Sequence, residues 1–91
     1  MNSVEKSIEE IEKMIQTLNA CADSNEEALS NLRMAYMGID GLDQRHKDQI
    51  DEVCADIGKS MSAAISSAQS ASVKLTFLKA KLEEYLSVTI G

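Results

Sequence analysis

The sequence predicts an all-α fold in which two long antiparallel helices form a helical hairpin. The 91-residue chain contains no proline, and two of its four glycines stand together in Gly38-Ile39-Asp40-Gly41. On both sides of this break, apolar residues recur at alternating intervals of three and four, which places them on one face of a helix. We therefore expect a single domain, 1–91, with helix 1 over about 3–37, a turn at 38–42 and helix 2 over about 43–88.

The first helix is predicted from its start signal and its apolar stripe. Asn2 or Ser3 is the expected N-cap, and Asn2 followed by Glu5 resembles a capping box. The stripe consists of Val4, Ile8, Ile11, Ile15, Leu18, Ala22, Asn25, Leu29, Leu32 and Tyr36. A second line, with a repeat of seven, consists of Met14, Cys21, Ala28 and Ala35. Together they form a face about three residues wide in every seven, which is typical of a helix with more than one neighbour.

A break within this helix is the alternative at residues 23–27, where Ser24 and Glu27 could form a new capping box. We expect the helix to continue, because the stripe passes through this segment in phase and an inserted loop would normally shift it. Asn25 then occupies a core-type position. A polar residue there can fix the helical register or the oligomeric state, and the alternative is that its side chain points to the rim.

The turn is predicted from its glycines and aspartates. The first helix is expected to end near Tyr36 or Met37, with Gly38 as its C-terminal cap. The second helix is expected to begin at an N-cap Asp40, or at Asp43 if the turn is longer.

The second helix carries its own apolar stripe. Its members are Ile50, Cys54, Ile57, Met61, Ala64, Ala68, Ala71, Leu75, Leu78, Leu82 and Tyr85. Residues 60–72 are nearly all small, and together with Gly58 they are expected to allow close approach of a neighbouring helix.

A turn near residue 40 would place residues opposite one another when their numbers add to about 80. Glu5 and Glu9 would then lie beside Lys74, with Lys79 close by. Because helix 2 is the longer helix, residues from about Phe77 onward would extend past the end of helix 1 and expose apolar surface.

Two helices alone cannot cover an apolar face of this width on each of them. We therefore expect a protein partner that completes a four-helix bundle, either a copy in a homodimer or another helical chain in a heterodimer. The residues expected at the partner interface are Met14, Leu18, Leu29, Leu32, Met61, Leu75, Phe77, Leu78, Leu82 and Tyr85.

The composition argues against several classes of partner. The formal net charge is −6, which disfavours binding to nucleic acid or to anionic membrane surfaces. No apolar run approaches the roughly 18–20 residues needed for membrane insertion. Residues 1–5 contain neither a basic region nor an apolar one, so we expect no Sec signal peptide.

The two cysteines, Cys21 and Cys54, could form a disulfide in an exported protein. With a turn near residue 40, however, they would lie some five residues out of register, roughly 7.5 Å along a helix. Buried free thiols are therefore the preferred interpretation.

The sequence contains no recognisable catalytic constellation. Its one histidine, His46, stands three residues after Asp43, but no second histidine or paired cysteine supplies further metal ligands. The adjacent pairs Glu9-Glu10 and Glu83-Glu84 face different ways on a helix, and no glycine-rich phosphate loop or nucleophile motif occurs. We expect no catalytic residue, no cofactor and no metal, and hence a protein that is not an enzyme.

The turn sequence Tyr36-Met37-Gly38 resembles the Trp-x-Gly turn of the small WXG-type proteins of type VII secretion, with tyrosine in place of tryptophan. These proteins are helical hairpins of about this length without a signal peptide. The resemblance implies that Tyr36 closes the end of the bundle and that Gly38 supplies the backbone freedom of the turn. It covers the whole chain in architecture but only these residues in motif.

The family's tail signal, Tyr-x-x-x-Asp/Glu, is not matched, because Tyr85 is followed four residues later by Thr89. Tyr36 and Asp40 have this spacing but stand in the turn. The chain is also similar to the helical companions of LXG toxins, which bind the toxin's N-terminal helical domain. The expected function is that of a companion that supports targeting or export of such a toxin from the bacterial cytoplasm. The chain itself could also be exported by the type VII route. The alternative is an unrelated structural or adaptor coiled-coil module.

Overall fold

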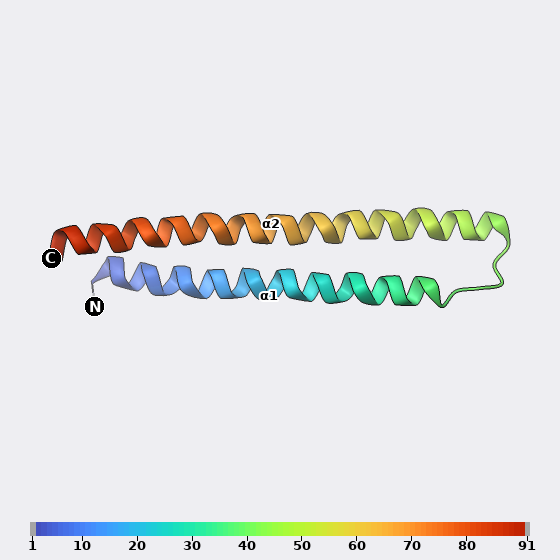
Figure 1. Ribbon diagram of the computed structural model, residues 1–91, viewed down its shortest axis with the longest axis horizontal. Helices are drawn as coiled ribbons and strands as arrows, with labels where there is room; N and C mark the ends of the chain where they lie inside the picture. Colours follow the sequence, from blue (N-terminus) through green and yellow to red (C-terminus); the bar gives the residue numbers. More distant parts are fainter. Residues whose placement is uncertain (1, 91) are drawn as a thin grey trace.

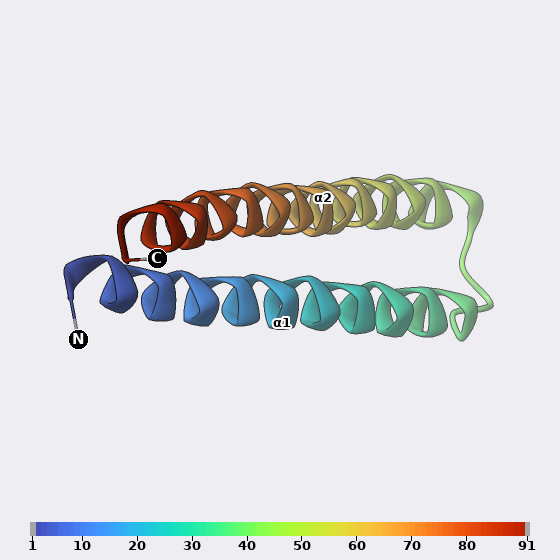
Figure 2. The same cartoon turned by 60° about the vertical axis from the view of Figure 1, so that its left-hand side comes forward.

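The computed structural model describes residues 2–90, without the side chains of residues 89 and 90, and within this range it contains two helices. Helix α1 spans Ser3–Met37 and helix α2 spans Gln44–Ile90. The helices run antiparallel and side by side, with both ends of the chain at the same end of the molecule (Figure 1), and a second view shows the same arrangement (Figure 2). The predicted fold class, an all-α hairpin of two long helices, is confirmed.

The molecule is a rod rather than a compact domain. It measures 70 × 15 × 14 Å, and its radius of gyration is 20.6 Å, whereas a compact domain of this length would have about 12 Å. Only three apolar residues of the described range, Ile11, Ala22 and Ala68, are buried. The hairpin therefore has a contact seam between its helices but no core comparable to that of a globular domain.

Helix α1 begins and continues as the sequence predicts. Asn2 is the N-cap, and its Oδ1 accepts a hydrogen bond from the backbone N–H of Glu5 at 2.8 Å. The helix passes through residues 23–27 without a break. Asn25 is half-buried, and its side-chain amide donates to the backbone carbonyl of Cys21 at 2.9 Å, so this donor is satisfied within its own helix.

The seam between the helices uses the predicted stripe of α1 up to Leu32 and one complete line of the predicted stripe of α2. Every α1 stripe member from Val4 to Leu32 is buried or half-buried. In α2 the same holds for one line of the stripe, which consists of Cys54, Met61, Ala68, Leu75 and Leu82. The second inner line of α2 is different from the predicted one and consists of Asp51, Gly58, Ile65, Ser72, Lys79 and Leu86.

The remaining line of the α2 stripe lies at the edge of the seam. Its members Ile57, Leu78 and Tyr85 are 37%, 47% and 55% exposed. Its other members, Ile50, Ala64 and Ala71, are half-buried, so the predicted inner stripe is wrong for Ile57, Leu78 and Tyr85. The reason is geometric, because a pair of helices covers about two lines in every seven residues and the apolar face of α2 is wider than that.

The register between the helices differs from the predicted one. The hydroxyl of Ser72 donates to Asn19 Oδ1 at 3.1 Å, and Lys79 Nζ lies 3.1 Å from Glu12 Oε1. Near the loop, Tyr36 donates to Asp51. The numbers of these opposed residues add to 87–91, instead of about 80 as a symmetric turn would give.

The loop explains this shift. Residues 38–43 do not turn back at once but extend along the hairpin axis, so that α2 begins beyond the end of α1 (Figure 1). Asp43, the later of the two predicted N-caps, accepts from the backbone N–H of His46 at 2.9 Å. Ile39 and Leu42 line a hollow beside Ile50, so the loop covers part of the first turns of α2.

Two predictions about the far end of the hairpin are consequently wrong. Residues from Phe77 onward do not all extend past α1, since Leu78 and Leu82 line one groove with Ile11. The lysine that pairs with the acidic start of α1 is Lys79, which bonds Glu12, rather than Lys74.

The predicted C-cap of α1, Gly38, is confirmed, but the backbone roles expected of the glycines differ in the structure. Gly38 caps α1 at φ −82°, a right-handed conformation open to any residue, whereas Gly41 has φ +72° and supplies the positive φ of the loop. A Cβ added at Gly58 would lie 3.9 Å from Leu29 Cδ1, an ordinary contact. The approach of α1 to α2 therefore does not require a glycine at this position.

We expect Gly58→Ala to stabilise the hairpin by about 0.5–1 kcal/mol, because alanine loses less backbone entropy than glycine within a helix. Gly41→Ala should destabilise it by roughly 1 kcal/mol, because alanine is strained at positive φ. Thermal unfolding followed by circular dichroism at one fixed protein concentration measures both variants. A lower midpoint for Gly58→Ala would contradict the packing described for this position.

Candidate functional site

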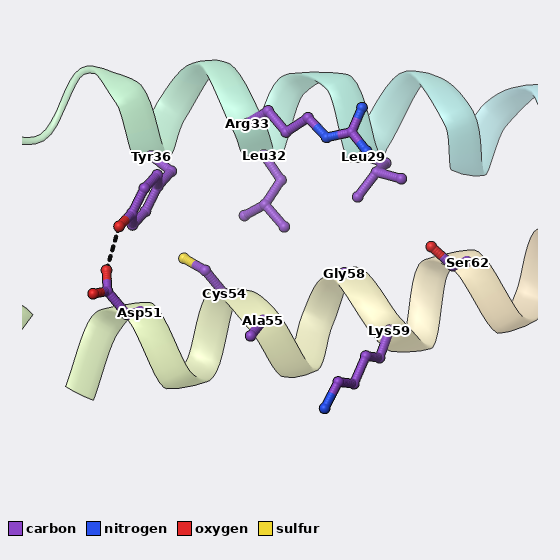
Figure 3. A pocket seen from close by; sticks show the side chains of 10 residues that line it. All are labelled: Leu29, Leu32, Arg33, Tyr36, Asp51, Cys54, Ala55, Gly58, Lys59 and Ser62. Carbon is purple, nitrogen blue, oxygen red and sulfur yellow. Dashed lines mark hydrogen bonds between the residues drawn. The ribbon is translucent and has the colours of Figure 1, made fainter. Parts of the chain in front are cut away.

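A groove opens between the last turns of α1 and the first half of α2 (Figure 3). Leu29, Leu32 and Cys54 point into the space between the helices, and small residues of α2 such as Gly58 leave it unfilled. Lys59 points away from α1. The groove has a volume of about 580 Å³ and is predominantly apolar.

A hydrogen-bonded cluster closes the groove toward the loop. The Tyr36 hydroxyl donates to Asp51 Oδ1, and Lys47 Nζ donates to Asp51 Oδ2 at 3.0 Å. The bond from Tyr36, followed by that from Lys47, holds the pKa of Asp51 below its ordinary value. The Asp51 carboxylate in turn raises the pKa of Tyr36 and the pKa of Lys47, because it stabilises their protonated forms. The cluster ties the end of α1 to α2.

The start of α2 carries the one histidine. His46 Nδ1 lies 2.8 Å from Asp43 Oδ1, and both side chains are exposed. Hydrogen bonds from the His46 backbone and then its side chain lower the pKa of Asp43, which suits a helix N-cap. Among the residues that the structure describes, no group of three or more histidine, cysteine, aspartate or glutamate side chains could hold a metal ion.

The two long sides of the hairpin differ in character. On one side the helices are joined by polar contacts, those of Tyr36 with Asp51, of Asn19 with Ser72 and of Glu12 with Lys79. The α2 residues among them belong to the inner line that includes Gly58, and the α1 residues lie opposite that line. The groove of Figure 3 opens on this side.

The opposite side carries an uncharged surface, which we call the flank surface. It combines two lines of residues spaced seven apart. One is the second apolar line of α1, and the other is the α2 line that lies at the edge of the seam. Its members are Met14, Cys21, Ala28 and Ala35 of α1 and Ile50, Ile57, Ala64, Ala71, Leu78 and Tyr85 of α2.

A groove near the start of α1 shows that both lines face the same way. It is lined by Ser7, which stands one heptad before Met14, and by Leu78 of the α2 line. Because residues seven apart lie on one side of a helix in a hairpin of this kind, the two lines form one continuous strip along the molecule.

The structure divides the predicted interface residues into two groups. One group lies in the seam and is half-buried between α1 and α2: Leu18, Leu29, Leu32, Met61, Leu75 and Leu82. The other group is exposed and consists of Met14, Phe77, Leu78 and Tyr85. Of these, Met14, Leu78 and Tyr85 are brought together on the flank surface.

Phe77 is separated from the other exposed residues. It is 67% exposed and lines a shallow hollow formed by α2 residues alone, among them Val73 and Ala80. Phe77 therefore lies on the outer side of α2, turned away from α1. A single residue step along the helix thus separates it from the surface that holds Leu78.

Both cysteines are free, but they differ in exposure. Cys54 is half-buried in the seam, whereas Cys21 is exposed on the flank surface. The preferred interpretation of two buried thiols is therefore wrong for Cys21. That interpretation assumed that the α1 line containing Cys21 is covered by a neighbouring helix. A hairpin of two helices leaves Cys21 exposed.

Sequence reasoning missed the role of Asp51, and it placed Lys79 near Glu5 and Glu9 rather than opposite Glu12. Both stand on the inner α2 line at positions where a charged residue disfavours an apolar seam, and each instead bonds a residue of α1. Their spacing of 28 residues, four heptads, was the available signal. It marks them as members of one line whose ends are polar and whose middle is apolar or small.

Comparison of the chain with models of protein families, with curated proteins and with solved structures found no match. Neither α1 nor the described part of α2 is long and apolar enough to cross a membrane.

We expect the midpoint of thermal unfolding to be highest between about pH 5 and pH 9. Asp51 has a lowered pKa when folded, so its contribution is complete above an unfolded pKa of about 4 and is lost as the pH falls. Tyr36 and Lys47 have raised pKa values, so their contributions are complete below about pH 10 and are lost as the pH rises.

Asp51→Asn should lower the midpoint at neutral pH and flatten its pH dependence on both sides. Asp43→Asn is the matched control, because asparagine is an equally good N-cap and Asp43 contacts neither the Tyr36 hydroxyl nor the Lys47 ammonium. This control should leave the alkaline limb unchanged. An Asp51→Asn profile identical to that of the unmodified chain would contradict the role given to the cluster.

Proposed function

We propose that this chain is a non-enzymatic helical hairpin of type VII secretion that binds a helical partner. The partner is a second hairpin or the N-terminal helical domain of an LXG-type toxin. Binding would complete a four-helix bundle and so support targeting or export of the bound chain. The partner then takes the place of the second layer that this hairpin lacks.

The flank surface is the observation that carries this proposal. It runs along both helices, it contains no charged residue, and large side chains such as Leu78 and Tyr85 are exposed on it. Contiguous apolar surface of this kind usually marks an interaction site in a protein.

The position of Tyr36 and Gly38 supports the assignment to type VII secretion. The Tyr36 ring lies at the loop end of the groove, near the place where the resemblance to the WXG-type turn implies an aromatic residue. Gly38 caps α1, although the positive φ of the loop is supplied by Gly41. The polar side of the hairpin is held by bonds within the chain, such as that of Tyr36 with Asp51. We assign the partner to the flank surface, on the opposite side of the hairpin.

A pair of substitutions on neighbouring residues tests the surface. Leu78→Glu should weaken partner binding at least 100-fold, because it places a charge in the apolar contact without touching the polar side of the hairpin. Phe77→Glu is the matched control, since it removes a larger and more exposed side chain from the outer side of α2. Affinity is measured by isothermal titration with the partner recovered from the native source and identified by mass spectrometry.

The proposal predicts that the recovered protein is a copy of this chain, another helical hairpin or an LXG-type toxin, and that neighbouring genes encode such a toxin or a secretion ATPase. Equal affinities for the unmodified chain and Leu78→Glu would exclude the flank surface as the binding site. A chain that is a well-folded monomer and recovers no helical protein would overturn the proposed function.

A further inference from the structure

Polar contacts recur along the groove side of the hairpin, and the series lapses at the groove itself. Helix α1 bonds α2 through Glu12 and through Asn19, and these two contacts stand one heptad apart on both helices. Two further steps of seven residues along the same α1 line lead to Arg33, and the facing α2 line has Gly58 at that level. Because Gly58 has no side chain, Arg33 meets no polar group across the seam.

The groove has a basic rim. Arg33 and Lys59 both line it and are exposed, and neither forms an ion pair among the side chains that the structure describes. The acidic residue that lines the groove, Asp51, already accepts hydrogen bonds from Tyr36 and Lys47. In a chain with a net charge of −6, this local excess of positive charge favours an anionic ligand.

The dimensions of the groove suit a small molecule rather than another helix. Its volume of about 580 Å³ lies within the range of small-molecule sites. Its α2 lining runs from Asp51 to Ser62, and these eleven residue steps cover roughly 16 Å. The bond of Tyr36 with Asp51 closes the loop end, and beyond Ser62 the half-buried Ile65 occupies the seam. A partner helix needs a longer strip, which the flank surface offers on the opposite side.

The two ends of the groove differ in polarity. Figure 3 shows the Arg33 side chain lying along α1 toward Leu29, and the Ser62 hydroxyl stands on α2 at the same end. Toward the loop the lining is apolar and includes Leu32 and Cys54, which point into the space between the helices. A ligand with an anionic head beside Arg33 and an apolar tail along Leu32 and Cys54 matches both ends.

We infer that the groove binds a single-chain fatty carboxylate. The Arg33 guanidinium donates charge-assisted hydrogen bonds to the carboxylate, and the Ser62 hydroxyl is at hand as a further donor. The hydrocarbon tail lies toward the loop. A saturated chain advances about 1.25 Å per bond, so dodecanoate, at about 15 Å, has the length of the groove. The site lies on the side opposite the flank surface, and the inference goes beyond the proposed function.

The thiol of Cys54 reports whether the groove is occupied. In a Cys21→Ser background it is the one thiol of the chain. Its reaction with dithiodipyridine, an uncharged thiol reagent, should slow as dodecanoate is added. At about ten times the dissociation constant the rate should fall about tenfold, since the groove is then empty in roughly one molecule in eleven. In the matched Cys54→Ser background, Cys21 reports the flank surface and should react at an unchanged rate.

Substitutions in the Cys21→Ser background test the anionic head. Arg33→Gln should weaken dodecanoate binding at least about tenfold, because it removes the charge-assisted bonds. Arg45→Gln is the matched control, since it removes the same charge from the start of α2, outside the groove. Gly58→Asp should abolish the protection of Cys54, because it places a carboxylate of the chain itself opposite Arg33. Its Cβ would make only an ordinary contact with Leu29, so the hairpin should keep its helicity.

Dodecanol carries the same tail without the charge and should protect Cys54 far less than dodecanoate does. Equal protection by the two compounds would overturn the inference, and so would equal affinities of Arg33→Gln and Arg45→Gln for dodecanoate. Equal protection of Cys54 and Cys21 would also overturn it, because the carboxylate would then coat apolar surface in general.

The remaining outcomes concern other occupants of the groove. No protection of Cys54 up to the solubility limit of dodecanoate, with helicity retained by circular dichroism, would overturn the inference. If the helical protein recovered from the native source protects Cys54 and dodecanoate does not, the groove belongs to the protein interface and the inference is wrong. Arg33→Gln should otherwise bind that protein as tightly as the unmodified chain does, which separates this site from the flank surface that Leu78→Glu tests.

Discussion

The structure depends on how much of each helix another helix can cover. Two helices in contact bury about two lines of side chains in every seven residues, and both helices of this chain carry a third uncharged line. The seam accordingly takes one set of lines, and within the described range Ile11, Ala22 and Ala68 are its buried residues. The lines left over gather on one side of the hairpin. The polar contacts between the helices occupy the other side, where they hold the seam in register.

Much of this fold is predictable from the sequence, because heptad spacing reports which residues share a face and glycines report where the chain turns. The stripe of α1 and the N-cap at Asn2 are found in this way. The rotation of α2 about its own axis cannot be predicted in this way. Three neighbouring lines of that helix are largely apolar or small, and periodicity does not show which two of them face α1. In the structure the rotation places Asp51 beside Tyr36 and Lys79 beside Glu12, and such tertiary contacts cannot be read from periodicity.

The register was unpredictable for a different reason. A turn of six residues can fold back at once or extend along the axis, and the sequence of residues 38–43 permits both. Extension shifts α2 by about two to three turns of helix, which moves Leu78 and Leu82 from a free end to a place beside α1. The candidate interface changes with it. An overhanging segment is replaced by a strip along both helices, which suits a partner as long as the hairpin itself.

The central claim is that this hairpin is one half of a helical bundle and gains stability from a partner. The most direct measurement is the dependence of the thermal unfolding midpoint of the purified chain on its concentration, followed by circular dichroism from about 1 to 100 µM. If copies complete the bundle, mass action raises the midpoint steadily over this range. A midpoint independent of concentration, with a sharp cooperative transition and a monomeric mass by light scattering, would contradict the claim that the hairpin needs a partner.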